Sequence, residues 1–193
     1  MTKKEEWLAG TRSAVPIMLG YVPVGIAYGV MARQAGLNTW QTVLMSLTVY
    51  GGASEMMAAG MVAQGAAVLT IVLTTFILNL RHIIMSTCVF NQMQGGRLPV
   101  RMLAAFGVTD ETFAVYTTTA NAPRTPRYFF SMAFCSYLSW ALGSWLGAIA
   151  TGLLPPLITA ALGISLYAMF IGLLMPGLHG NGRLAALVVL PAL

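Results

Sequence analysis

The stretch that decides the fold is Val72–Phe90, which reads VLTTFILNLRHIIMSTCVF. It belongs to a hydrophobic run over about residues 65–90, and a helix of about 20 apolar residues crosses the hydrocarbon of a bilayer. Its polar side chains are spaced four, three and four residues apart, which places them on one face of a helix; they are Thr75, Asn79, His82 and Ser86. The sequence therefore predicts a transmembrane helix with one polar face.

The composition of the whole chain supports a membrane protein. Of its 193 residues, 58% are hydrophobic and 8% are charged, and the mean hydropathy is +0.77. A soluble domain carries about 25% charged residues, so this chain could not cover itself in water. The net charge of +5 is spread singly or in pairs between hydrophobic stretches, which indicates membrane orientation and not nucleic-acid binding. Cys88 and Cys135 lie in apolar runs without metal-ligand spacing, so we predict buried thiols and no metal site.

The hydropathy pattern predicts one all-α integral membrane domain over residues 1–193, with about six transmembrane helices and a partial seventh. Residues 1–12 are expected to form a cytoplasmic N-terminal segment. The fourth stretch is weak because Thr109-Asp110-Glu111 interrupts it, and the last is too short to span, so we expect a truncation there. The expected spans are 13–33, 40–62, 65–90, 98–120, 128–153, 157–176 and a partial 183–193.

The distribution of lysine and arginine predicts a multi-pass protein of the cell membrane with a cytoplasmic N-terminus. With simple alternation of spans, six basic residues lie inside and three outside; a fourth span that re-enters would change the later part of this count. The inside set is Lys3, Lys4, Arg12, Arg124, Arg127 and Arg183, and the outside set is Arg33, Arg97 and Arg101.

The first span is crowded with helix-weakening residues. Pro16 and Pro23 stand among Gly20, Gly25 and Gly29, and backbone groups freed at membrane depth are tolerated only beside protein or a wet cavity. We therefore expect at least one broken helix, here one that lines a solute site with Gly20 and Gly25, and we leave open an internal inverted repeat. The alternative is close helix packing, which small residues at four-residue spacing favour.

Ionisable residues inside spans are functional candidates because they are costly in lipid. This chain places Glu55, Arg81, His82, Asp110 and Glu111 in or near spans. Arg81 points away from Asn79 on a helix, roughly 200° around it, so it needs a carboxylate, an interface or a separate cavity. Thr109 and Thr112 resemble a helix start with Asp110 and Glu111 in its first turn. Desolvation disfavours three ionised carboxyls beside one arginine, so we expect one to be protonated or paired with protonated His82. The alternatives are a hydrogen-bonded helix seam for the polar face and simple capping for the carboxyls.

Four segments, in order, resemble the AzlC-like family, the large subunits of branched-chain amino acid exporters. They are GYVPVGIAYGVMARQAGL, GGASEMMAAGM, FILNLRHIIMS and GVTDETFAVY, and the resemblance covers about residues 10–178. The family's NLRH motif falls on Asn79–His82 and its TDE motif on Thr109–Glu111. Glu55 and Met56 depart from the glutamine and phenylalanine expected there, which weakens the assignment of the solute.

The resemblance implies a secondary transporter subunit that exports leucine, isoleucine or valine together with a small AzlD-like membrane subunit. We hypothesise that the amino acid binds beside Asn79, with its carboxylate at Arg81 or backbone amides and its ammonium group at Asp110 or Glu111. His82, Glu55 or Asp110 would carry the coupled proton. A proton or sodium gradient is the expected driving force, no cofactor is expected, and a homo-oligomer stays open.

Other readings of the sequence remain beside this one. The chain could be an accessory subunit without a solute path, or a transporter of another small solute, including a metal held by Met56, Met57 and Met61. An intramembrane hydrolase using Ser54 and His82 is disfavoured, because Glu55 stands where the motif needs a glycine. We therefore expect no enzymatic activity.

Overall fold

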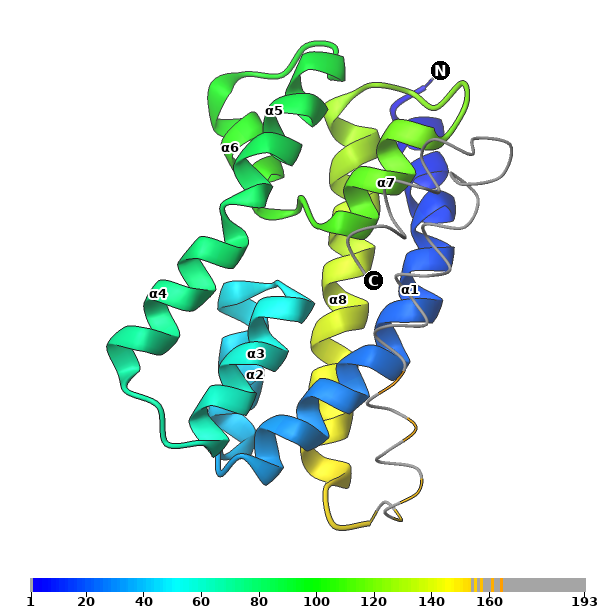
Figure 1. Cartoon of the computed structure of the whole chain (residues 1–193). Helices are drawn as coiled ribbons and strands as arrows, with labels where there is room; N and C mark the ends of the chain where they lie inside the picture. The colour runs from blue at the N-terminus through cyan, green and yellow to red at the C-terminus, as the bar shows by residue number, and fades with distance from the viewer. Residues whose placement is uncertain (1, 154, 156, 158–160, 162–163, 165–193) are drawn as a thin grey trace, which may run out of the picture.

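The computed structural model describes residues 2–153 together with 155, 157, 161 and 164, and this part is all-α (Figure 1). The predicted partial span 183–193 lies outside the described residues, as does 157–176 apart from Leu157, Ala161 and Ile164. Three continuous stretches are long and apolar enough to cross a membrane: Lys3–Gln34, Val68–Gln92 and Pro126–Ala150. The described helices are α1 (Lys3–Gln34), α2 (Thr39–Val49), α3 (Gly52–Ala63), α4 (Val68–Asn79), α5 (Arg81–Gln92), α6 (Leu98–Phe106), α7 (Asp110–Thr118) and α8 (Pro126–Ala150).

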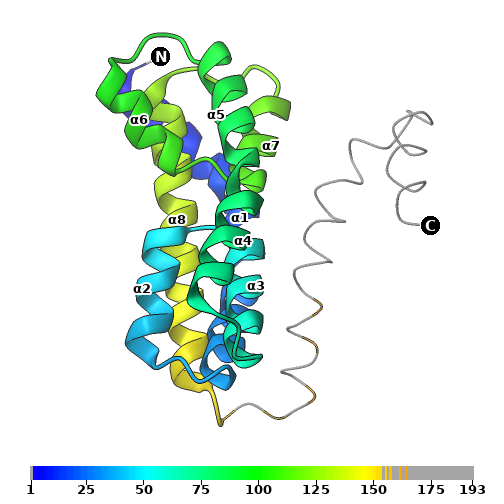
Figure 2. The same ribbon diagram turned by 60° about the vertical axis from the view of Figure 1, so that its left-hand side comes forward.

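The centre of the fold is the parallel pair α1 and α8, which lie side by side along their length (Figures 1 and 2). A Cβ atom on Gly29 would collide with the Ser144 carbonyl, and one on Gly147 with the Ile26 carbonyl. The small residues therefore allow the two backbones to touch, as their spacing predicts.

The prediction that the first span is broken was wrong, because α1 runs continuously through Pro16 and Pro23. Residues 3–12 of the expected N-terminal segment form the start of this same helix, where Thr2 and Glu5 form a capping box. Close packing on α8 holds α1 together where proline removes hydrogen bonds of the helix.

The stretch 40–62, predicted as one span, is a helical hairpin. Asn38 caps the start of α2, and Tyr50 ends it with a φ of 47°, in the left-handed region. Gly51 follows, and α3 begins at Gly52 and returns to the end of the bundle from which α2 came (Figure 1). The hairpin tip, Tyr50–Gly51, therefore lies midway along the bundle.

The helices α4 and α5 continue one another across a local tightening at Leu80. There the Leu80 N–H bonds the Ile77 carbonyl and the Ile83 N–H bonds the Leu80 carbonyl, each three residues back instead of four. This change of pitch bends the helix at its middle.

The stretch 98–120 is a second hairpin and not a span. Gly107 ends α6, Thr109 begins α7, and both outer ends lie at the N-terminal end of the bundle. There the Gln94 N–H donates to the Arg124 carbonyl at 2.6 Å. The interrupted hydropathy seen in the sequence thus marks a turn inside the molecule.

The described topology contains an inverted repeat. In each half a long helical segment is followed by a hairpin: α1 by α2–α3, and α4–α5 by α6–α7. The two hairpins enter from opposite ends, and Figure 2 shows them in opposite halves of the bundle. Their tips meet near its middle.

Candidate functional site

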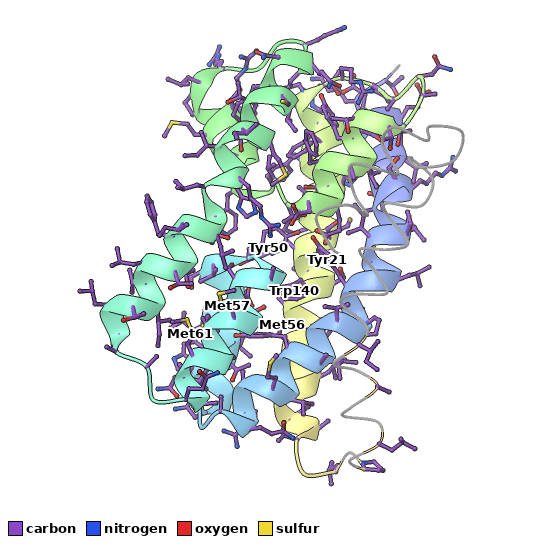
Figure 3. The ribbon with its side chains drawn as sticks, in the orientation of Figure 1. Tyr21, Tyr50, Met56, Met57, Met61 and Trp140 are labelled. Carbon is purple, nitrogen blue, oxygen red and sulfur yellow. The ribbon has the colours of Figure 1, made fainter. Side chains whose placement is uncertain are left out.

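The two hairpin tips enclose a small pocket midway along the bundle. Its walls come from both tips, from the start of α5 and from the α1–α8 pair. They are Tyr21, Tyr50, Gly51, Gly52, Ala53, His82, Thr109, Asp110, Glu111 and Trp140. Figure 3 shows Tyr21, Tyr50 and Trp140 gathered at this level.

The start of α3 offers backbone donors to the pocket. No side chain caps this helix, and the first amides of a helix have no partner within it. Glu55, fully buried, accepts the Gly51 N–H at 2.9 Å, which leaves the amides of Gly52 and Ala53 at the pocket wall. Together with the helix dipole they favour a negatively charged group there.

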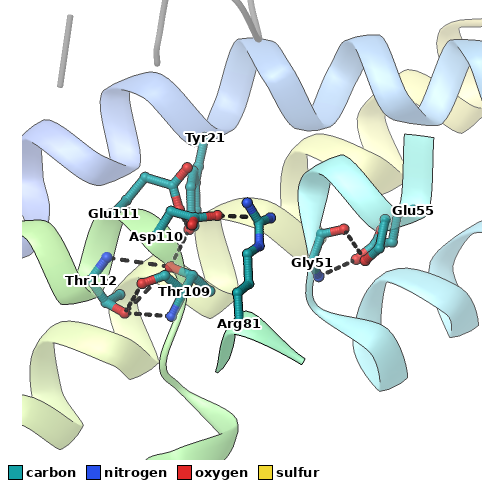
Figure 4. Close-up of polar contacts among 9 residues, drawn as sticks. Tyr21, Gly51, Glu55, Arg81, Thr109, Asp110, Glu111 and Thr112 are labelled. Atoms are coloured by element: carbon teal, nitrogen blue, oxygen red, sulfur yellow. Dashed lines mark hydrogen bonds and ion pairs between the residues drawn. The ribbon is translucent and has the colours of Figure 1, made fainter. Parts of the chain in front are cut away.

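The start of α7, unlike that of α3, is capped by a side chain and carries two acidic residues. Thr109 and Thr112 form a capping box, which confirms the helix start predicted from the sequence. Asp110 and Glu111 lie in the first turn, and the Tyr21 hydroxyl bonds Glu111 Oε2 at 2.6 Å and Thr109 Oγ1 at 2.7 Å (Figure 4). The capping box satisfies the amides of Thr109 and Thr112, and the two acidic side chains of this first turn favour a cation.

Arg81 meets Asp110, with 2.9 Å between Nη2 and Oδ2 (Figure 4). Of the three options expected for Arg81, a carboxylate, an interface or a separate cavity, the structure shows the carboxylate. Both side chains keep some exposure, 39% for Arg81 and 26% for Asp110, so the pair is not sealed in the protein. Asp110, His82 and Glu111 line the pocket, and Arg81 joins these three candidate residues through its ion pair with Asp110.

Other candidates lie elsewhere. Gly25 packs against α8, where an added Cβ would lie 3.0 Å from the Trp140 carbonyl, and neither it nor Gly20 is among the residues of this pocket. Asn79 lies just behind the tip turn, near Gly51, and its buried Oδ1 has no hydrogen-bond partner.

The predicted polar face does not line one path. Thr75 faces a cavity between α4 and the α2–α3 hairpin, together with Glu55, whereas Ser86 lies in a separate groove beside His82. Because the helix bends at Leu80, the half of the polar face before the bend and the half after it point toward different cavities.

Three aromatic residues of the pocket were missed by sequence reasoning: Tyr21, Tyr50 and Trp140. Tyr50 is 3% exposed, and its hydroxyl has no hydrogen-bond partner. Trp140 donates from Nε1 to both oxygens of Glu55 at 3.3 Å. The available signal was a hydrogen-bonding aromatic residue in each of two apolar segments, GYVPVG and YLSWALG.

Apart from His82, the residues behind the alternative readings lie outside this pocket. Met56, Met57 and Met61 all lie on α3 away from its walls (Figure 3). The Ser54 hydroxyl donates to the Gly51 carbonyl at 2.9 Å, so it is engaged by the tip turn and not by His82. Within the part of the chain that the structure describes, no group of three His, Cys, Asp or Glu could hold a metal ion.

Comparison with known proteins identifies the family. Residues 16–154 match the family model for the AzlC protein. A membrane protein of Archaeoglobus fulgidus is 32% identical over 96% of this chain and 82% of its own. The inner membrane protein YgaZ of Escherichia coli is 31% identical over 88% and 72% of the two chains. The branched-chain amino acid transport protein AzlC of Bacillus subtilis is 27% identical over 77% and 61%. No solved structure matches. The chain belongs to the AzlC family.

Proposed function

We propose that this AzlC-family membrane protein is a secondary transporter subunit that exports branched-chain, hydrophobic amino acids through the pocket between the hairpin tips. One observation carries the proposal: an uncapped helix start and an acidic helix start meet there, midway along the bundle. Such broken helices, with their ends turned to a central site, are typical of secondary transporters. A relative named as a branched-chain amino acid transport protein supports the choice of solute.

The two helix starts suit the two charges of an amino acid. Its carboxylate would accept hydrogen bonds from the amides of Gly52 and Ala53 and from the hydroxyl of Tyr50. Its ammonium group would bind Asp110, which forms an ion pair with Arg81. Binding would then release Arg81 from Asp110, and its guanidinium would turn to the carboxylate.

The solute's side chain has an apolar pocket beside this site. Tyr50 forms the wall common to both pockets. The apolar pocket is lined by Tyr50, Leu103, Ala104, Phe106, Gly107, Phe130, Ala133, Phe134 and Tyr137. Burying a leucine side chain there would contribute about 1.5–3 kcal/mol, which favours hydrophobic over polar amino acids.

Ion coupling would use the buried carboxyls. Glu55 and Glu111 are 0% and 5% exposed, and a buried carboxylate is costly without a cation or a proton. We propose that one of the acidic groups, or His82, takes up a proton in step with the solute.

The hairpins strengthen the proposed cytoplasmic location of the N-terminus. Because α6–α7 returns to the N-terminal end, seven basic residues lie toward that end and one, Arg33, at the other, among the described residues, with Arg81 between them. The seven are Lys3, Lys4, Arg12, Arg97, Arg101, Arg124 and Arg127. This bias follows the positive-inside rule.

The test is efflux of radiolabelled leucine from cells that express the full-length protein with and without its small AzlD-like partner, before and after the proton gradient is collapsed. We expect efflux that needs both subunits and the gradient. Arg81→Ala should abolish it at normal membrane levels, whereas Arg101→Ala, outside the pocket, should not. Full efflux by Arg81→Ala would refute the binding scheme.

A second candidate function is an accessory subunit without a solute path. The pairing of Arg81 with Asp110 at 2.9 Å favours it, because such a pair could serve structure alone. In that case the protein would still be needed for efflux. Efflux would persist, however, when Arg81 and Asp110 are replaced together by two neutral residues that hydrogen-bond to each other.

A further inference from the structure

The two hairpin tips share a sequence pattern as well as a shape. Tyr50-Gly51-Gly52-Ala53-Ser54-Glu55 and Phe106-Gly107-Val108-Thr109-Asp110-Glu111 each have an aromatic residue, then glycine, then glutamate four residues after the glycine. In both, the glycine lies at the turn and the glutamate in the first turn of the returning helix. Glu55 and Glu111 therefore both lie near the start of the returning helix of their hairpin.

Each of these glutamates is tied to the α1–α8 pair by one aromatic donor. Trp140 of α8 donates to Glu55 at 3.3 Å, and Tyr21 of α1 donates to Glu111 at 2.6 Å. The two rings touch each other edge to face, with 5.3 Å between centroids. One aromatic pair on the central helices thus holds both tips.

The tips also fit the central helices by shape. A Cβ atom on Gly52 would lie 2.9 Å from the Trp140 ring, and one on Gly107 would collide with the side chain of Ala133. Neither tip can rest in this position with a larger residue, so both positions are set by the central pair.

The hairpins extend from the pocket to opposite ends of the bundle. Both tips line the pocket. From its tip the α2–α3 hairpin extends to the end opposite the N-terminus, and α6–α7 extends to the N-terminal end (Figure 1). Movement of one tip away from the central helices would open the pocket toward that tip's end only.

We propose that Trp140 and Tyr21 are positioning residues that hold the pocket closed, Trp140 toward the end opposite the N-terminus and Tyr21 toward the N-terminal end. This proposal rests on the proposed function, because it takes the pocket as the solute path. It does not depend on which solute is transported. Alternating access then consists of releasing one glutamate–aromatic bond while the other persists.

The test is sided labelling of cysteines placed at the tips of the full-length protein. In a background with Cys88→Ala and Cys135→Ala, Ala53→Cys and Val108→Cys report on the two tips. A membrane-impermeant maleimide is applied to cells from outside and to inverted vesicles from the other face. Trp140→Phe should raise the labelling rate of Ala53→Cys from the end opposite the N-terminus only. Tyr21→Phe should raise that of Val108→Cys from the N-terminal end only.

We expect a rise of about fivefold for Trp140→Phe, the population change that the loss of one net hydrogen bond produces. Tyr21→Phe, which loses bonds to both Glu111 and Thr109, should raise its rate by at least as much. Tyr28→Phe is the matched control. Tyr28 stacks on Trp140, but its hydroxyl bonds the Thr42 carbonyl near the hairpin's outer end, so neither reporter should change.

Where Trp140→Phe fails to insert, Gly52→Ala displaces the same tip and should give the same sided increase. Glu111→Ala should likewise release the α6–α7 tip and raise labelling of Val108→Cys from the N-terminal end. Labelling that rises at both faces in each variant would indicate general loosening and overturn the proposal, as would unchanged labelling. Because labelling needs no solute, failure of leucine efflux leaves this result interpretable by itself.

Discussion

The contact between α1 and α8 gives the sharpest prediction for stability. Gly147 faces the α1 backbone, and a methyl group there would collide with the Ile26 carbonyl. A carbonyl of a helix backbone cannot rotate aside as a side chain does. Gly147→Ala therefore requires the two helices to separate.

The expected cost is about 1–3 kcal/mol, the range for adding a methyl group to a packed interface. It is reduced by up to about 1 kcal/mol because alanine is the better helix former. The control is Gly60→Ala in α3, where the added Cβ meets nothing within 4 Å. That change should be neutral or stabilise by about 0.4–1 kcal/mol.

The assay is unfolding of the purified full-length protein in detergent, followed by loss of helical circular dichroism as denaturant rises. Gly147→Ala should unfold at lower denaturant than the wild type, and Gly60→Ala at equal or higher denaturant. If Gly147→Ala proves as stable as Gly60→Ala, the close contact of α1 and α8 is refuted.

Three further predictions concern the pocket. Arg81→Asp or Asp110→Arg alone should impair insertion and folding, and the two changes together should restore both. The double variant should still not export leucine. Recovery of efflux would show that the pair is only structural. Tyr50→Phe should raise stability by about 1 kcal/mol, because it removes a buried hydroxyl without a partner, and should weaken the apparent affinity for leucine in efflux assays about fivefold; unchanged affinity would exclude this hydroxyl from the site. Glu55→Gln keeps an acceptor for the Gly51 N–H and should cost about 1 kcal/mol in denaturant unfolding, while efflux loses its dependence on the proton gradient; gradient dependence that persists would move the coupling to Asp110, Glu111 or His82.

Sequence reasoning predicted the membrane class and the polar cluster, since both follow from local rules. An arginine in an apolar span needs a carboxylate, and Arg81 does pair with Asp110. The acidic helix start at Thr109 was recognised because capping depends on neighbours in the chain.

The hairpins could not be predicted in the same way. Two half-length apolar helices and one spanning helix have similar hydropathy over about 20 residues, so 40–62 resembled a span. The turn depends on Tyr50 taking a left-handed conformation, which a tyrosine in an apolar run does not indicate. Pro16 and Pro23, by contrast, suggested a break that packing on α8 prevents.

The aromatic residues that hold the tips were hidden for a related reason. A tyrosine or tryptophan in a hydrophobic span is expected to pack in the core or at an interface. Its role here depends on Glu55 and Glu111, 85 and 90 residues away in the chain. Only the folded arrangement brings these partners together.

The most direct measurement of the central claim, that the solute binds between the tips, is protection of a tip cysteine by leucine. Ala53→Cys lies in the pocket wall, and Gln64→Cys, exposed in the loop after α3, is the control. The claim predicts that saturating leucine slows maleimide labelling of Ala53→Cys and leaves Gln64→Cys unchanged. Labelling of Ala53→Cys at the same rate with and without leucine, in protein that exports leucine, would contradict it.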